Sequence, residues 1–144
     1  MLRTIILASL IGLSPADLSE PDRILIEQGA RCGVDPWTGF ELLRVEELAG
    51  VDKPRGMLIA KACFESRGNP RAIGDAGKAV GLLQLWSWAE VTTDRTHPIG
   101  SAYAFVGAIL DRMRRTKRHC PRARDVFKLS WIRVNRGPVW RRPD

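Results

Sequence analysis

The chain has 144 residues, a length that suits one domain with a buried core. Its apolar fraction of 44% and charged fraction of 27% are those of an ordinary globular protein and exclude a disordered chain. The net charge of +7 is uneven, because residues 1–100 carry 11 Lys+Arg and 13 Asp+Glu, whereas residues 101–144 carry 12 and 3. This basic C-terminal third predicts an anionic partner of one of three kinds: nucleic acid, anionic lipid or an acidic cell-wall polymer.

The first sixteen residues have the layout of a secretory signal peptide. Arg3 provides the positive end, residues 5–13 form a short apolar run, and the small residues of the segment SPA lead to a cleavage point after Ala16. The run is too short to span a bilayer. We therefore predict a signal peptide over residues 1–16 and one domain over residues 17–144, with a buried N-terminal helix as the alternative for the first segment.

The rest of the chain is mostly helical in pattern. Ser19 is predicted to cap a helix over residues 22–30, and Asp35 to cap a second over residues 36–48. Pro54 opens a third helix that is apolar on nearly every side and is therefore expected in the core. Gly68 ends this third helix.

A glycine-rich loop follows the third helix, and no stretch alternates long enough to predict an extended strand. Three more helices are predicted over residues 87–93, 101–118 and 122–134. The expected fold class is mainly α, as a compact single domain of about six helices with a small β region after the third.

The cysteines and histidines do not predict a metal site. No CxxC pair occurs, and the two histidines are not at the spacing of metal ligands. An exported protein could form one disulfide and leave one thiol. The sequence leaves all three pairings open among Cys32, Cys63 and Cys120.

Glu65 is the first candidate for chemistry, because it lies in the last turn of the most apolar helix. Burial disfavours the ionised carboxylate, and the negative end of the helix dipole disfavours it by a further ~0.3–1 kcal/mol. A glutamate placed in this way keeps its proton to unusually high pH, as a general acid requires. The expected apolar neighbours are Leu58, Ile59, Ala62 and Phe64. The alternative is an ordinary surface glutamate at a helix end.

The loop after this helix suits a bulky ligand. Its small residues let the backbone approach a ligand closely, and Gln84 offers a donor and an acceptor that suit sugar hydroxyls and acetamido groups. The segment is not a phosphate-binding loop, because the GxxxxGK[ST] pattern and a preceding strand are missing. The small residues are Gly74, Gly77, Ala79 and Gly81.

Read together, these residues resemble the SLT-type lytic transglycosylase family of the lysozyme-like superfamily. The resemblance covers about twenty residues and consists of E-S at Glu65-Ser66, N-P-x-A at residues 69–72 and, after the glycine-rich loop, G-L-L-Q at residues 81–84. It implies an α+β lysozyme-like fold and cleavage of the β-1,4 bond between N-acetylmuramic acid and N-acetylglucosamine in peptidoglycan. The family needs no cofactor.

By this resemblance, Glu65 is the catalytic residue. It protonates the glycosidic oxygen and then, as a carboxylate, takes the proton of the muramoyl C6 hydroxyl, which gives a 1,6-anhydro product. Most glycosidases need two carboxylates, and the next acid in this sequence is Asp75. Asp75 as a second carboxylate would make the protein a hydrolytic muramidase, whereas its loop position favours a turn former.

The resemblance also gives substrate-binding candidates. Ser66 orients the carboxyl group or contacts substrate, with a helix-end serine as the alternative. Gly81 and Gln84 line the sugar cleft, and a structural polar role is the alternative for Gln84. The family's A-x-x-Y-N-x-G motif is matched near residues 130–138, where Asn135 fits but Val134 replaces the tyrosine.

Aromatic residues supply the remaining candidates. Tyr103 and Trp131 are the candidates to replace the missing tyrosine. Trp86 and Trp131 lie near the proposed cleft in the sequence, as do Trp88 and Trp140, and sugar faces pack on aromatic rings. The alternative for each tryptophan is a core position.

The Arg-rich segment 112–124 predicts attraction to anionic cell-envelope polymers, with a solvated surface as the alternative. The expected partner is therefore the peptidoglycan glycan strand, bound by a monomer that is exported or delivered to the cell envelope by a phage. Two other functions stay open: a degenerate protein that binds glycan without cutting it, and a basic nucleic-acid-binding protein. No aromatic-interleaved or zinc-finger pattern supports nucleic acid.

Overall fold

The computed structural model describes residues 17–50, 54–86 and 94–119, which form four α-helices and one small antiparallel sheet. The helices are α2 (Glu20–Arg31), α3 (Pro36–Leu48), α4 (Met57–Ser66) and α5 (Pro98–His119). Between α4 and α5 lie β1 (Ile73–Gly74), the 3-10 turn η2 (Asp75–Gly77) and β2 (Ala79–Val80). The mainly helical class and the small β region after the third predicted helix are confirmed.

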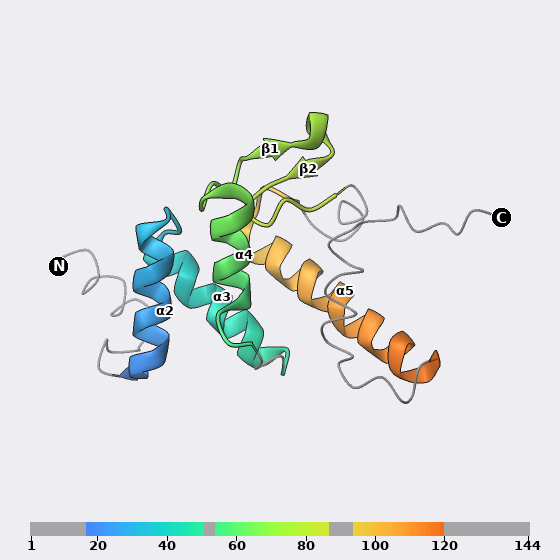
Figure 1. Cartoon of the computed structure of the whole chain (residues 1–144), viewed down its shortest axis with the longest axis horizontal. Helices are drawn as coiled ribbons and strands as arrows, with labels where there is room; N and C mark the ends of the chain where they lie inside the picture. Colours follow the sequence, from blue (N-terminus) through green and yellow to red (C-terminus); the bar gives the residue numbers. More distant parts are fainter. Residues whose placement is uncertain (1–16, 51–53, 87–93, 120–144) are drawn as a thin grey trace.

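Within the described residues, α3 packs against each of the three other helices. In Figure 1, α2 and α4 run beside each other and the β1–β2 hairpin extends from the C-terminal end of α4. The helix α5 is the longest of the described helices, and in this view it lies on the opposite side of α4 from α2. The helices predicted over residues 87–93 and 122–134, and the signal peptide predicted over residues 1–16, lie outside the described residues.

The first two helices have the N-caps that the sequence predicts, although α2 begins at Glu20 rather than at residue 22. Ser19 Oγ accepts a hydrogen bond from the backbone N–H of Asp22 at 3.3 Å. Asp35 Oδ1 accepts from the N–H groups of Trp37 and Thr38 at 3.0 and 3.2 Å. A proline in the first turn of each helix adds the fixed φ that a helix start favours.

The start of α4 is capped from another helix. Its N-cap residue Gly56 has a φ of 82° and no side chain to offer. Instead, Glu46 of α3, which is fully buried, accepts from the N–H groups of Gly56 and Leu58, each at 2.8 Å. Burial raises the pKa of the Glu46 carboxyl, and these two hydrogen bonds act in the opposite direction.

The core lies between α3, α4, α5 and the segment that follows β2. A fully buried Leu or Phe side chain contributes about 1.5–3 kcal/mol, so this cluster supplies most of the driving force for folding. Its buried members are Val34, Leu42, Leu43, Val45, Met57, Leu58, Ile59, Ala62, Leu82, Leu83, Leu85, Ala102, Phe105, Val106 and Ile109.

A disulfide joins the end of α2 to α4. Of the three pairings that the sequence leaves open, the structure forms Cys32–Cys63, with a Cα–Cα distance of 5.7 Å. The turns that follow these two helices touch backbone to backbone, since a Cβ at Gly68 would overlap the carbonyl of Gly33. The crosslink closes a span of 31 residues and is expected to stabilise the fold by ~3–4 kcal/mol. Cys120 lies outside the described residues.

Candidate functional site

Glu65 lies in the last turn of α4, as the sequence predicts. The helix ends at Ser66, and Arg67 follows in the left-handed conformation with a φ of 51°. The N–H of Gly68 donates to the carbonyl of Ala62 at 3.2 Å, which closes the helix end. Glu65 is thus in the last turn of α4. Figure 1 shows the chain passing from this end of α4 to the hairpin.

The surroundings of Glu65 differ from the prediction. Its side chain is 32% exposed, and Phe64, expected among its apolar neighbours, is 88% exposed. The carboxylate is paired with Lys61, whose Nζ donates to Oε1 at 3.0 Å from one helical turn earlier. The predicted apolar enclosure of this carboxyl group is therefore wrong, because α4 turns Phe64 outward and places an ammonium group against Oε1.

Lys61 is a buried cation beside Glu65 that the apolar pattern of α4 does not predict. The residue is 7% exposed, and its Nζ lies 5.0 Å from the centroid of the Phe105 ring on α5. Burial lowers the pKa of Lys61, while the hydrogen bond and the charge of Glu65 raise it. The sequence signal for this pair is the spacing of four residues on one predicted helix.

Ser66 fastens the end of α4 to the segment after β2. Its Oγ lies 3.1 Å from the carbonyl oxygen of Ala62 and 2.7 Å from that of Leu82. A hydroxyl has one proton, so it donates to one of these carbonyls at a time. The shorter contact ties the residue next to Glu65 to the segment that carries the G-L-L-Q motif.

The hairpin is two residue pairs long. Ile73 pairs with Val80 and Gly74 with Ala79, in antiparallel register. Asp75 lies in the turn at the tip, in the left-handed conformation with a φ of 48°, and its carbonyl accepts from the N–H of Lys78 at 3.2 Å. These contacts fit the turn-forming interpretation of Asp75.

The Gln84 side chain stabilises the loop by hydrogen bonds to its backbone. Its Nε2 donates to the carbonyl oxygens of Ala72 and Gly81, each at 3.0 Å, which uses both amide hydrogens. Its Oε1 lies against Gly74, where a Cβ would overlap it. The described contacts of Gln84 are thus structural, and its binding to sugar stays a prediction.

Gly81 is required by close packing. It has a φ of 90°, and a Cβ there would overlap the carbonyl of Arg95. Its N–H donates to the carbonyl of Ala72 at 2.8 Å. Together with the contact of Ser66 to Leu82, these bonds join the E-S, N-P-x-A and G-L-L-Q segments into one hydrogen-bonded unit at the end of α4.

Two aromatic candidates lie within the described residues. Trp86 is half-buried, and its ring centroid lies 5.8 Å from Lys78 Nζ. Tyr103 is 49% exposed on α5, and within the described residues it donates no hydrogen bond to Glu65. Trp131, Val134 and Asn135 lie outside these residues, as do Trp88 and Trp140, so their roles stay predictions.

The Arg-rich segment is described as far as residue 119, on the last turns of α5. Arg115 pairs with Asp111 at 2.9 Å, and both side chains are more than half exposed, so the pair adds little stability. An open hollow of about 470 Å³ lies along this face. Its lining is Asp111, Arg114, Arg115, Arg118 and His119.

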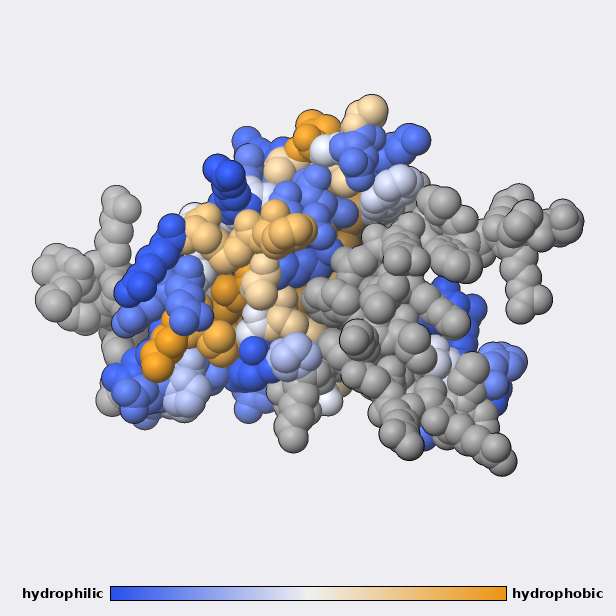
Figure 2. Space-filling view, in the orientation of Figure 1, coloured by the Kyte–Doolittle hydropathy of each residue, from blue (hydrophilic) through white to orange (hydrophobic). Residues whose placement is uncertain are grey.

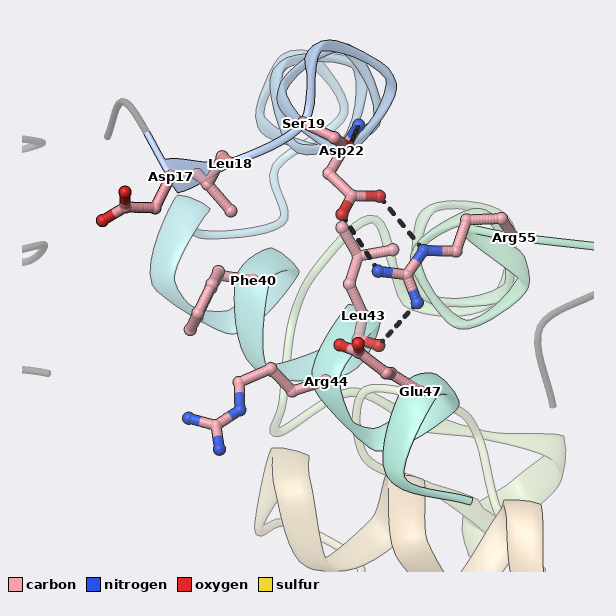
Figure 3. Close-up of a pocket in the computed structure, with 9 residues that line it drawn as sticks. All are labelled: Asp17, Leu18, Ser19, Asp22, Phe40, Leu43, Arg44, Glu47 and Arg55. Atoms are coloured by element: carbon pink, nitrogen blue, oxygen red, sulfur yellow. Dashed lines mark hydrogen bonds and ion pairs between the residues drawn. The ribbon is translucent and has the colours of Figure 1, made fainter. Parts of the chain in front are cut away.

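A pocket of about 270 Å³ lies between the start of α2, the middle of α3 and the start of α4. Figure 3 shows its dominant contact, in which the Arg55 guanidinium binds Asp22 with two hydrogen bonds, at 3.1 and 3.0 Å. The third hydrogen bond of Arg55 goes to the Leu43 carbonyl at 3.0 Å. Glu65 is not among the lining residues, and the pocket lies at the opposite end of α4 from it.

Exposed apolar side chains are spread over several elements. Figure 2 shows apolar patches over the region of α2 and α4 and over the hairpin. The exposed large side chains on these elements are Ile24 at 46%, Phe64 at 88% and Ile73 at 73%. Phe64 is the one that neighbours Glu65 in the chain.

Comparisons with family models, with curated proteins and with solved structures find no match to this chain. In the described part of the chain, no helix has both the length and the hydrophobicity needed to cross a bilayer. Nor do these residues contain a group of three or more His, Cys, Asp or Glu side chains that could hold a metal ion.

Proposed function

We propose that this protein is a peptidoglycan lytic transglycosylase with a lysozyme-like fold, in which Glu65 is the single acid and base. The observation that carries the proposal is the hydrogen-bonded unit at the end of α4, built by Ser66, Gly81 and Gln84. In the sequence, the resemblance to the family consists of three separate short segments. Their contacts with one another beside a partly exposed carboxylate support a common site.

The proposed chemistry needs one carboxyl group. Glu65 donates its proton to the glycosidic oxygen as the bond to the muramoyl C1 breaks. The carboxylate then takes the proton of the C6 hydroxyl while the C6 oxygen bonds to C1, which closes the 1,6-anhydro ring. The substrate supplies the nucleophile, so no second carboxylate is required. The position of Asp75 in the hairpin turn favours this scheme over a hydrolytic muramidase.

The proposed location is the cell envelope, reached by export to the periplasm or cell wall or by phage delivery. The Cys32–Cys63 disulfide supports an oxidising compartment, because such crosslinks persist mainly outside the cytosol. The proposed partner is the glycan strand, bound by a monomer. The arginine-lined hollow on α5 supports an additional attraction to anionic envelope polymers.

A second candidate function is glycan binding without cleavage. The observation that favours it is the ion pair of Glu65 with Lys61, because this pair stands in place of the apolar enclosure that the sequence predicts for a general acid. Val134, at the position of the family's tyrosine, points the same way. Under this alternative the site would hold glycan but release nothing.

Incubation of the purified protein with peptidoglycan tests both functions. The proposal predicts 1,6-anhydromuropeptides by mass spectrometry, and their loss in Glu65→Gln. Reducing ends in place of anhydro sugars would identify a hydrolase. Retention on sedimented cell walls without any released product would favour the binding protein. Binding to duplex DNA that weakens steeply with salt, with no affinity for cell walls, would favour nucleic acid instead.

A further inference from the structure

Lys61 is the feature of the site that the single-glutamate chemistry leaves without a role. Its ammonium group lies between Glu65 Oε1, at 3.0 Å, and the ring of Phe105, whose centroid is 5.0 Å from Nζ. The lysine side chain is 6% exposed and the glutamate side chain 32% exposed. The cation is thus held inside the protein, while the carboxylate reaches the surface.

Stability alone does not explain a lysine at this position. Burial of an ammonium group disfavours folding, and an apolar side chain of similar volume is often at least as stabilising as a buried ion pair. The order of the pair is also the weaker one on a helix, where a glutamate preceding a lysine by four residues is better than the reverse. The neighbouring buried residues Leu58 and Ala62 are apolar, whereas Lys61 carries a charge.

The pair leaves the two oxygens of Glu65 in different states. Oε1 accepts the hydrogen bond from Lys61, whereas Oε2 accepts none from any other described residue. Because the ammonium is fixed by burial and by the Phe105 ring, the carboxyl plane is held by one oxygen. The other oxygen is then available to a ligand at the partly exposed side.

We propose that Lys61 is a positioning residue for Glu65, which fixes the carboxyl group through Oε1 and makes Oε2 the oxygen that exchanges protons with the glycan. This inference rests on the proposed transglycosylase function. In the first step, the proton on Oε2 passes to the glycosidic oxygen as the C1–O bond breaks. In the second, the C6 hydroxyl proton passes to Oε2 as the C6 oxygen bonds to C1. The carboxyl group ends as it began, and the ammonium stabilises the carboxylate between the steps.

Several elements meet around Lys61 at this end of α4. Among the described charged side chains, Glu65 raises the Lys61 pKa through its hydrogen bond and its charge. From α5, the Phe105 ring lies near the ammonium, and Cys32, which follows α2, is joined to α4 by the disulfide. The carboxylate of Glu46 on α3 is bound to the opposite end, at Gly56 and Leu58.

Steady-state kinetics on peptidoglycan test the proposal with three variants. Lys61→Met keeps the volume and removes the charge, and we expect kcat to fall at least about tenfold with little change in KM, because the lost interaction acts on the reacting group. Lys61→Arg keeps the charge and should recover part of this loss. Arg23→Met removes an exposed cation from α2 and should leave both constants unchanged. An unchanged kcat in Lys61→Met would overturn the proposal and leave the proposed function intact.

An activity-independent readout separates the two proposals. The pKa of Lys61 can be followed through its Nζ and Cε resonances by NMR in the wild type and in Glu65→Gln. The pair predicts a lower Lys61 pKa in Glu65→Gln, because the partner that raises it is removed. An unchanged Lys61 pKa would show that the two groups do not interact and would overturn the positioning role. If the pKa changes but the wild type releases no anhydro product, the proposed function fails and the catalytic role of Lys61 fails with it.

Discussion

The two ends of α4 each bring together a carboxylate and a cation, and they use them differently. At the N-terminal end, Glu46 is fully buried and both of its oxygens accept backbone N–H bonds. At the C-terminal end, Glu65 is about one-third exposed, and in the described structure only its Oε1 is engaged. A carboxylate with both oxygens bound in the interior can only hold the fold together. A carboxylate with one oxygen left at the surface can exchange a proton with a ligand.

The cations differ in the same way. Arg55 makes three hydrogen bonds, two to Asp22 and one to the Leu43 carbonyl (Figure 3). A guanidinium stays charged at every physiological pH, so the charge of Arg55 is constant in this range. Lys61 at the other end is an ammonium whose pKa is lowered by burial. Its described ion pair is with the partly exposed Glu65, which suits a site rather than a scaffold.

Glu65→Gln is expected to give the largest effect on activity. Loss of a general acid and base lowers the rate by about 10²–10⁴-fold, which corresponds to about 3–5 kcal/mol in the barrier. The free energy of unfolding should also fall, by about 1–3 kcal/mol, because the amide oxygen can still accept from Lys61 but no longer balances the charge of this buried ammonium. Product release and urea denaturation measure the two quantities. A large loss of stability with little loss of rate would mean that Glu65 stabilises the fold and is not the catalytic residue.

Glu46→Gln is the matched change at the other end. The amide can accept a hydrogen bond from only one of the two N–H groups, so the other is left buried without its acceptor. The free energy of unfolding should fall by about 1–3 kcal/mol, as for a buried unsatisfied donor. The rate per folded molecule should stay at the wild-type value. A rate that falls as far as in Glu65→Gln would show that Glu46 also belongs to the site.

The sequence predicts the caps of α2 and α3 better than it predicts either end of α4. Ser19 and Asp35 cap their helices as expected, because a cap depends on residues within one turn. The cap of α4 escapes prediction, since Glu46 comes from another helix and ten residues away from Gly56. A capping acid of this kind has no local pattern.

The environment of Glu65 cannot be predicted from the sequence for a related reason. Local apolar content suggests enclosure, but which face of α4 is covered depends on where α3 and α5 pack. Packing buries Lys61 and exposes Phe64, the reverse of their hydrophobicity. The choice of Cys32–Cys63 among three pairings likewise depends on the approach of α2 to α4, which no spacing encodes.

Ser66→Ala should give a smaller effect that reaches the site indirectly. Removal of the hydroxyl breaks the contact with the Leu82 carbonyl, and we expect about 1 kcal/mol less stability. Because this contact fixes the end of α4 to the loop, the rate should also fall, but less than in Glu65→Gln. Ser19→Ala is the control, since it removes a helix cap of similar worth far from Glu65. Equal rates in the two serine variants would mean that the loop contact does not support the site.

The smallest effect is expected at the Asp22–Arg55 pair, and it depends on pH. The hydrogen bond from Arg55 lowers the pKa of Asp22 below its ordinary value of 3.8. A carboxyl whose folded-state pKa is depressed stabilises the protein above its unfolded-state pKa, and this stabilisation is lost as pH falls through the folded-state value. Asp22→Asn should therefore cost about 1 kcal/mol or less at pH 7, since both side chains are partly exposed. The cost should shrink below pH 3.8 as the wild-type carboxyl becomes protonated. Urea denaturation of both proteins at pH 7 and pH 3 measures this difference, and a gap that stays constant between the two pH values would contradict the ion pair as its source.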